Sequence, residues 1–345
     1  MRQVIIYGVL LALALGGAWA RWTMEPTGEG EDKVVLLAGE VEQLESIEWK
    51  GEDAQAVLTR KTDEHGAYVW VQTVKVEERK TPPAAPGEEP LVEPVAELAE
   101  AALTERVEKK DVFKAGDKGD ELLASFSPLH AIRRLDNVDP AKLTEIGLDA
   151  PKETLVVTRR GQAVTLSIGG EAYGTKDRYV RNEVTGEIFL LDDQLLKNIE
   201  FAKTRLPDRD LWSLDRPGIA SATLAAGEKS VQAEQRNPDD EAKATWARAG
   251  VEAADEQLAT WMDKALKLKG TSYVDPESED GPKDLQLRFS LTLTPAGKDK
   301  PETLQVFQDG TDGDYYGRSE HTRGTLKLLR APTRELIEDV AALLP

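Results

Sequence analysis

The sequence predicts an α+β protein in which an N-terminal membrane helix precedes two tandem repeats, each an antiparallel β-sheet with helices packed on one face. Three observations predict this fold class. An uncharged run covers Val4–Ala20, the segments 120–140 and 255–276 resemble each other, and short strand-like runs follow both segments in the same order. Self-similarity of this kind indicates a duplicated structural unit.

Composition limits the classes of function. The chain has 345 residues, which is enough for about two domains of ordinary size. Its 63 acidic and 44 basic residues give a formal net charge of -19, which disfavours nucleic acid as a partner. There is no cysteine, so disulfides, thiolate metal ligands and thiol nucleophiles are excluded. A mean hydropathy of -0.44 excludes a polytopic membrane protein.

The N-terminal segment predicts the cellular compartment. A run of about 17 uncharged residues is at the lower limit for a bilayer-spanning helix, and Trp19 and Trp22 fit an aromatic belt at the membrane surface. We expect residues 1–22 to be an uncleaved anchor, with cleavage after Ala20 as the alternative. Both readings place the soluble part in the periplasm, beside the bacterial inner membrane. The anchor prediction rests on Val4, Ile5, Ile6, Leu10, Leu11, Leu13, Leu15 and Trp19.

The first unit is expected at 34–212, after a polar tether at 23–33. Short β-branched and aromatic runs indicate its first strands, at 34–37, 47–49, 56–60 and 68–72. Residues 77–118 interrupt this pattern with a Pro- and Glu-rich stretch that suits neither a strand nor a helix interior. We therefore expect an insertion there, with a short helix over 95–107 before the sheet resumes at Val112.

An amphipathic helix is predicted from Asp120 onward, and Pro128 is expected to break or bend it. Its apolar residues recur every three or four positions and therefore share a face: Leu122, Leu123, Phe126, Leu129, Ile132 and Leu135. Asp139-Pro140 then begins a short helical turn that stops at Gly147. An antiparallel meander and a closing helix complete the unit, with strands at 155–157, 164–168, 179–181 and 188–191 and the helix at 194–201.

The second unit is expected at 213–345 and repeats this order. Strand runs at 219–224, 231–236 and 245–248 precede a helix that starts at Asp255. The apolar face of that helix contains Leu258, Trp261, Leu266 and Leu268. Four more strands and a final helix follow, at 287–293, 304–307, 315–318, 326–329 and 334–344. The acidic loop 277–282 is this unit's main departure from the first.

Several motifs together resemble the bacterial DUF4340 family. They are the N-terminal membrane segment, Ile-x-Trp at 47–49, a strand ending at Trp70, IGLDAP at 146–151, LSIGG at 166–170, DRYVR at 177–181 and IFLLDD at 188–193. The resemblance covers nearly the whole chain in two copies, and the second copy lacks the GLxxP and IGG elements. It implies an exported, membrane-associated protein associated with ABC transporter components of the gliding-motility type. It implies no catalytic residues.

The sequence contains no convincing catalytic or metal-binding constellation. Gly169-Gly170 stands before Thr175-Lys176, the wrong order for a phosphate-binding loop, and predicts a turn instead. The segment 309–314 with Glu320 lacks glycine where a calcium loop requires it, so we expect a hairpin turn. His65, His130 and His321 are isolated in the sequence. We therefore predict no catalytic residues, no cofactor and no metal.

The function we expect is a non-enzymatic, membrane-anchored accessory protein of an envelope ABC transporter system. It would bind transporter subunits or other envelope proteins through a free sheet face or the seam between the two units. One alternative is a carbohydrate- or cell-wall-binding module, in which a ligand groove would be lined by Trp49, Trp70, Trp212 and Trp246; core packing of these residues is the competing interpretation. A carboxylate-based hydrolase is the other alternative, and it predicts a cleft with two carboxyl groups of perturbed pKa.

Overall fold

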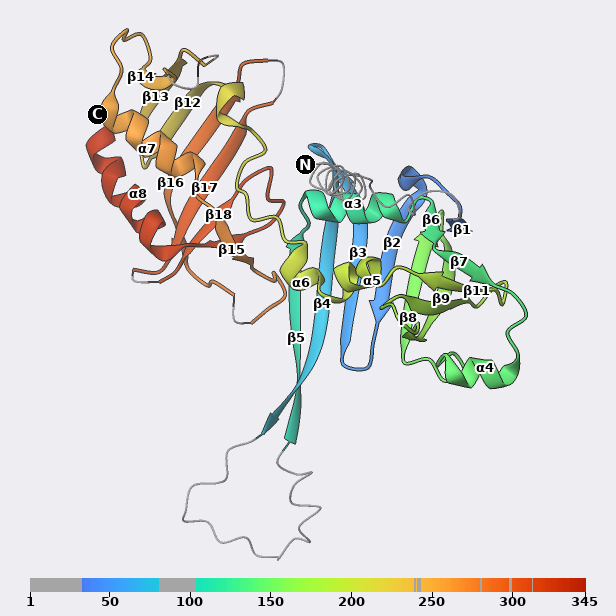
Figure 1. Ribbon diagram of the computed structural model, residues 1–345. Helices are drawn as coiled ribbons and strands as arrows, with labels where there is room; N and C mark the ends of the chain where they lie inside the picture. The colour runs from blue at the N-terminus through green and yellow to red at the C-terminus, as the bar shows by residue number, and fades with distance from the viewer. Residues whose placement is uncertain are drawn as a thin grey trace, which may run out of the picture.

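The computed structural model describes residues 33–80, 104–238, 240, 243–279, 281–297, 300–311 and 313–345. These residues form an α+β fold of antiparallel sheets with few helices (Figure 1). The anchor predicted at 1–22, nearly all of the tether and the central part of the predicted insertion lie outside the described residues. Among the residues that are described, no helix has the length and apolar character needed to cross a membrane.

The first unit contains, among its described residues, a nine-stranded sheet with the order β5-β4-β3-β2-β8-β9-β10-β11-β7. Neighbouring strands in it are antiparallel. The strands are β2 (Leu44–Lys50), β3 (Ala54–Asp63), β4 (Gly66–Lys80), β5 (Thr104–Lys114), β7 (Arg133–Leu135), β8 (Glu153–Arg159), β9 (Gln162–Glu171), β10 (Arg178–Asn182) and β11 (Ile188–Leu191). A separate small sheet pairs β1 (Val34–Leu37) with β6 (Leu129–Ala131).

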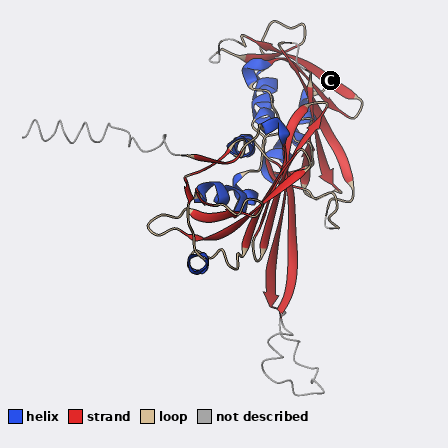
Figure 2. Cartoon of the chain, turned by 90° about the vertical axis from the view of Figure 1, so that its right-hand side faces the viewer, coloured by secondary structure: helices blue, strands red, loops and turns tan. Residues whose placement is uncertain are grey.

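Among the described residues, four short helices accompany this sheet: α3 (Asp117–Ser125), α4 (Pro140–Glu145), α5 (Asp193–Glu200) and α6 (Ala202–Arg205). Leu122 of α3 and Ile199 of α5 belong to the same buried cluster as Phe189 of β11, so both helices cover one sheet face (Figure 2). Ile188 points to the opposite face because side chains alternate along a strand, and there it packs with Ile146, which follows α4. The first unit therefore has a small second cluster on the other side of its meander.

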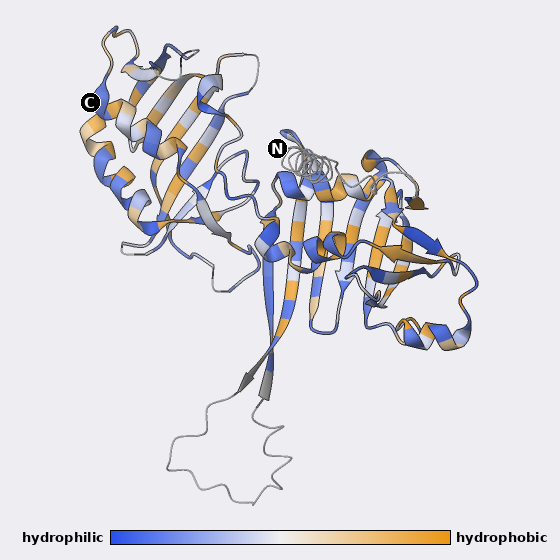
Figure 3. Cartoon of the chain, viewed as in Figure 1, coloured by the Kyte–Doolittle hydropathy of each residue, from blue (hydrophilic) through white to orange (hydrophobic). Residues whose placement is uncertain are grey.

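The second unit repeats this plan with an eight-stranded sheet in the order β14-β13-β12-β16-β17-β18-β19-β15 among the described residues. Its strands are β12 (Ile219–Ala226), β13 (Lys229–Arg236), β14 (Thr245–Arg248), β15 (Gly270–Tyr273), β16 (Leu285–Pro295), β17 (Glu302–Asp309), β18 (Tyr315–Arg318) and β19 (Leu326–Leu328). Helices α7 (Glu256–Leu266) and α8 (Arg330–Leu343) lie against the same face of this sheet (Figure 3). Two 3-10 turns, η1 (Val41–Gln43) and η2 (Arg216–Gly218), precede the first strand of each large sheet.

The two large sheets share one strand order. Without β5, the first order becomes β4-β3-β2-β8-β9-β10-β11-β7, which matches β14-β13-β12-β16-β17-β18-β19-β15 strand for strand. Helices α3 and α7 precede the last strand of each order, and α5 and α8 follow the meander. This agreement is what a duplicated unit requires. It leaves β5, the β1–β6 sheet and α4 as additions to the first unit.

The helix predicted from Asp120 is shorter than its periodicity indicated. Helix α3 ends at Ser125, and Leu129 and Leu135 belong to β6 and β7. Pro128 cannot donate a backbone hydrogen bond, and beyond it two short strands placed apolar residues at spacings that imitate a helix. Leu122 and Leu123 are buried on the sheet as predicted. The short helix predicted after Asp139 is α4, with the Asp139 side chain accepting a hydrogen bond from the Lys142 N–H.

The predicted insertion at 77–118 does not interrupt the sheet at its ends. Residues 77–80 complete β4, and 104–114 form β5, which pairs with β4 from Lys80↔Thr104 to Trp70↔Lys114. The helix expected over 95–107 is therefore wrong for its last four residues, and the remainder lies outside the described residues. Charged residues dominate both strands where they pair only with each other, so the alternating apolar signal of a half-buried strand was missing there.

Candidate functional site

The two units meet along a polar seam formed by β5, the connecting segment Leu206–Asp210, β15 and the loop Ser319–Gly324. The segment Leu206–Asp210, called the strap below, is bonded to both units through its backbone. On the first unit, Asp208 N–H donates to the Lys114 carbonyl at 3.0 Å. On the second unit, Gly270 N–H donates to the Arg209 carbonyl at 2.8 Å. The backbone of Asp208 is thus bonded to the first unit and that of Arg209 to the second, so the peptide between them is the junction of the two units.

A buried ion cluster lies at this junction. Asp208 Oδ2 is 2.6 Å from Lys114 Nζ at the end of β5 and 2.8 Å from His321 Nε2 of the second unit. The three side chains are only 11%, 10% and 18% exposed for Lys114, Asp208 and His321 respectively. Burial opposes ionisation of Asp208, but hydrogen bonds and charge from His321 and Lys114 prevail and hold its pKa far below the usual range. Asp208 is therefore an ionised carboxylate at neutral pH, and it joins the two units.

Further contacts extend the seam on both sides of the cluster. Arg323 Nε lies 2.7 Å from Asp63 Oδ2, at the hairpin between β3 and β4. The rings of Trp70 and Tyr273 meet edge to face, with centroids 6.0 Å apart. Tyr273 packs against the apolar clusters of both units, so it is where the two cores approach each other.

The seam also joins the two features by which the units differ most. Lys110 of β5, in the predicted insertion, contacts Glu277 Oε2 of the acidic loop at 2.5 Å and Asp275 Oδ2, just before that loop, at 3.4 Å. These charges raise the pKa of Lys110. The insertion of one unit and the acidic loop of the other therefore face each other as opposite charges.

An open cleft of about 650 Å³ lies beside the ion cluster. Asp117 and Asp120 from the first turn of α3, His65 from the first unit and Glu320 from the second line it. Desolvation raises the pKa of Asp120, and the nearby Asp117 adds to this effect while Lys114 opposes it. The cleft thus contains two carboxyl groups whose pKa values are displaced in opposite directions, Asp120 upward and Asp208 downward.

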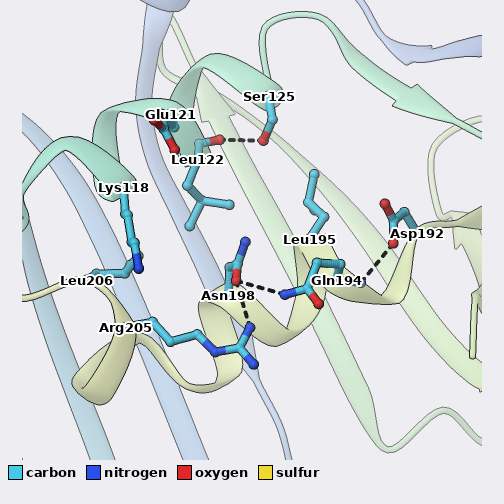
Figure 4. A pocket seen from close by; sticks show the side chains of 10 residues that line it. All are labelled: Lys118, Glu121, Leu122, Ser125, Asp192, Gln194, Leu195, Asn198, Arg205 and Leu206. Atoms are coloured by element: carbon cyan, nitrogen blue, oxygen red, sulfur yellow. Dashed lines mark hydrogen bonds between the residues drawn. The ribbon is translucent and has the colours of Figure 1, made fainter.

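A second groove of about 560 Å³ separates α3 from α5 (Figure 4). Leu122 of α3 and Leu195 of α5 point into the space between the helices. Its polar side is organised by Asn198, whose Oδ1 accepts hydrogen bonds from Arg205 at 2.7 Å and Gln194 at 3.2 Å. Gln194, Asn198 and Arg205 therefore bind one another along this groove.

The four tryptophans predicted to line a ligand groove are not brought together. Trp49, Trp212 and Trp246 are buried, at 5%, 8% and 0% exposure, and Trp49 and Trp246 belong to the cores of different units. Trp70 is half-buried and borders a separate cleft of about 520 Å³ beside the loop 274–285. Burial of three of them matches the core-packing interpretation and leaves the carbohydrate-binding alternative without its shared platform.

The three histidines have different surroundings. His321 is bonded to Asp208, His65 lies on the rim of the same cleft and His130 is exposed on β6. Within the part of the chain that the structure describes, no three His, Asp or Glu residues are grouped as metal ligands. Asp309 Oδ1 accepts from the Lys283 and Asp284 N–H groups, whereas Glu320 Oε2 accepts from Thr303 N–H, so the two carboxylates of the imperfect calcium loop serve different turns.

The cluster of Lys114, Asp208 and His321 could not be found from the sequence, because its members are about 100 residues apart from one to the next. Each is preceded and followed by ordinary loop or strand residues. The one available signal was the strap, where Pro207 and two aspartates stand between a helix and a buried tryptophan.

Three of the motifs that carried the family resemblance, IGLDAP, LSIGG and DRYVR, assemble into one structural cluster. Gly170 N–H donates to the Ile146 carbonyl at 2.8 Å, and a Cβ on Gly169 would lie only 2.4 Å from that carbonyl oxygen. Arg178 donates to the Gly169 carbonyl and Arg181 donates to the Leu148 carbonyl. IGLDAP, LSIGG and DRYVR are therefore adjacent because they fasten α4 to the meander. The turn predicted at Gly169-Gly170 begins later, since both glycines belong to β9.

Comparison with known proteins agrees with these motifs. The sequence profile described as Domain of unknown function (DUF4340) matches residues 117–288, about half of the chain. The chain contains a DUF4340 domain. No curated protein and no solved structure matches.

The DUF4340 match is narrower than the resemblance over nearly the whole chain in two copies. It begins with α3, includes all four of the motifs at 146–193 and ends within β16. The match therefore crosses the strap. It covers the second part of the first unit and the first part of the second unit. The strands that carry Trp49 and Trp70 precede it.

Proposed function

We propose that this protein is a non-enzymatic, membrane-anchored periplasmic accessory protein of an envelope ABC transporter system, acting through protein-protein contacts. The observation that carries the proposal is the use of Lys114, Asp208 and His321. This cluster has the residue types of a catalytic site, yet its charged atoms are bonded to one another and join the two units. A scaffold that presents two units to a partner needs such a junction between them.

Two further points support the proposal. The apolar run Val4–Ala20 has the length and flanking tryptophans of a membrane anchor. The transporter context comes from the resemblance to the DUF4340 family, whose description states no function. The anchor would keep both units at the membrane surface, within the reach of a tether of about ten residues, or roughly 35 Å when extended.

The experiment is purification of the tagged full-length chain from the bacterial membrane in mild detergent after in vivo crosslinking. We expect ABC transporter subunits to co-purify with the full-length chain. A matched chain with residues 1–22 replaced by a cleavable export signal should reach the periplasm and recover far less of them. Intact mass of the extracted protein distinguishes an anchor from cleavage after Ala20. Recovery of the chain from membranes without transporter subunits would contradict the proposal.

A carboxylate-based hydrolase is the second candidate, because one observation favours it specifically. Asp120 and Asp208 border the same cleft with pKa values displaced in opposite directions, which is a common arrangement for an acid and a base. Against it, Lys114 and His321 both contact the same oxygen of Asp208, which leaves that oxygen poorly placed to accept a substrate proton.

The second candidate is tested with panels of chromogenic glycosides and esters. Hydrolysis that Asp120→Asn abolishes and Glu121→Gln leaves intact would favour the hydrolase, because Glu121 is the exposed neighbour on the same helix. Equal hydrolysis rates for the wild type, Asp120→Asn and a sample without protein would exclude the hydrolase function for these substrates.

A further inference from the structure

The interface between the two units is mostly polar, as is typical of interfaces that allow domains to move relative to each other. Each unit has its own apolar cluster, and the contacts across the seam are chiefly ion pairs and one aromatic pair. Interfaces of this polar kind between domains permit relative motion, whereas large apolar ones do not. The seam therefore differs in kind from the two cores that it joins.

Packing at the seam is also incomplete. A cavity of about 110 Å³ lies between β5 and β15, lined by Phe113, Pro207 and Tyr273 among others. The Tyr273 hydroxyl is buried without a hydrogen-bond partner among the described residues, and burial near Asp208 and Asp210 raises its pKa. An unpaired buried hydroxyl destabilises the closed arrangement, because water would satisfy it if the units separated.

The strap supplies an axis for that separation. Up to Asp208 its backbone is bonded to the first unit, and from Arg209 onward to the second. Rotation about the backbone between Asp208 and Arg209 therefore preserves the hydrogen bonds on both sides. The side chain of Asp208 is the part that crosses the junction, since its carboxylate reaches His321.

The pairing of Asp208 makes opening feasible. Lys114 and Asp208 both remain with the first unit when His321 moves away, so the buried carboxylate keeps its cationic partner in either state. Opening would thus break the Asp208–His321 and Asp63–Arg323 contacts without leaving Asp208 as an isolated buried charge, which is the costly case. We propose that the seam is a latched hinge: His321 and Arg323 of the second unit hold Asp208 and Asp63 of the first, and their release lets the units rotate about the strap and widens the cleft beside it.

This inference goes beyond the proposed function and holds whichever partner the protein has. It is tested by measuring the distance between spin labels on the two units. The chain has no cysteine, so Lys142→Cys on α4 and Glu338→Cys on α8, both exposed, can be labelled uniquely. We expect one narrow distance in the otherwise unchanged chain. His321→Ala should increase the longer-distance population at least tenfold, and Asp63→Asn should produce a smaller increase.

Two matched variants separate a latch from a merely structural role. His321→Gln retains a side-chain N–H that can donate to Asp208, and should restore the narrow distance. His65→Ala removes another histidine on the rim of the same cleft and should leave the distance unchanged. If His321→Ala does not fold, Asp63→Asn carries the same measurement, because Asp63 lies at an exposed hairpin. An identical narrow distance in folded His321→Ala and Asp63→Asn, even with lower thermal stability, would overturn the hinge.

Discussion

The two units share a strand order, but the two helices that cover each sheet are packed differently. In the second unit, α7 and α8 are joined directly, because the Trp261 indole N–H donates to the Leu336 carbonyl at 2.9 Å. In the first unit, α3 and α5 are separated by the groove of about 560 Å³. Phe126 occupies the position of Trp261, but α3 ends there and the chain turns into β6. One topology thus accommodates a closed and an open helix pair.

Two of the differences between the units lie where the units meet. Strand β5 is an addition to the first unit, and it supplies Lys110 and Lys114 to the seam. The acidic loop is the main departure of the second unit, and it supplies Glu277, with Asp275 just before it. The comparison shows that features specific to each copy contribute to their mutual interface, while the sheets keep one strand order.

The largest expected effects come from Trp261 and Phe126, which occupy equivalent positions in the two units. Replacing each tests whether the two positions contribute similarly to the stability of their cores. Trp261→Ala should lower the free energy of unfolding by about 4–5 kcal/mol, and Phe126→Ala by about 3–4 kcal/mol, since Trp261 also loses a buried hydrogen bond. Urea unfolding measures both values. Hydrogen exchange should show the loss of protection confined to the altered unit, and loss in both units from either variant would contradict separate cores.

Asp208→Asn comes next, because it removes a buried carboxylate that both units use. We expect a loss of about 2–4 kcal/mol at about pH 7. The folded-state pKa is depressed, so the stabilisation is present above the ordinary pKa of about 4 and disappears as pH falls toward the folded value. Wild type and variant should therefore converge in acid, as measured by urea unfolding across pH.

The control for that variant is Asp210→Asn, two residues along the strap. Asp210 Oδ1 pairs with Lys269 at 2.7 Å, but both side chains are more than half exposed, so the loss should stay below about 1 kcal/mol. Equal losses for the two variants would mean that strap charge in general, and not the buried cluster, holds the units together.

Gly169→Ala tests a feature found only in the first unit. The new Cβ would lie 2.4 Å from the Ile146 carbonyl oxygen, so the turn after α4 must move, at about 1–3 kcal/mol. Gly170→Ala is the matched control, because its nearest atom would be 3.5 Å away, an ordinary contact. Thermal unfolding of the two variants measures the difference, and equal effects would show that the cluster of family motifs tolerates displacement.

Sequence reasoning located elements whose signal is local. The meander strands, the Asp139 cap of α4 and the closing helices agree with the structure because alternation, helix caps and turn glycines act within a few residues. It was wrong for 126–135, where two short strands imitate helical spacing, and for 104–107, where a charged strand lacks apolar alternation.

The seam was predicted only as a place between two units. Its chemistry could not be, because Lys114, Asp208 and His321 come together through the packing of one unit on another, and no local pattern records that packing. For the tryptophans the sequence left two interpretations open, a ligand groove and core packing. Their residue type suggests a binding surface, but burial decides the matter, and burial of Trp49 and Trp246 depends on sheet faces that single residues do not reveal.

The smallest expected effects come from Asp120 and Asp255, which open the two similar segments and whose pKa values move in opposite directions. Asp255 caps α7 and accepts the Leu258 N–H at 3.0 Å, and this bond, with Arg248 beside it, lowers its pKa. Asp120 lies inside α3, and desolvation raises its pKa. Asp255→Asn should therefore destabilise the protein above about pH 4, whereas Asp120→Asn should stabilise it there, each by less than about 1 kcal/mol after solvent screening. Both differences should vanish in acid, as followed by the melting temperature across pH. Shifts of the same sign would show that one residue type at equivalent positions has kept one role in both units, contrary to the geometry of the two helix starts.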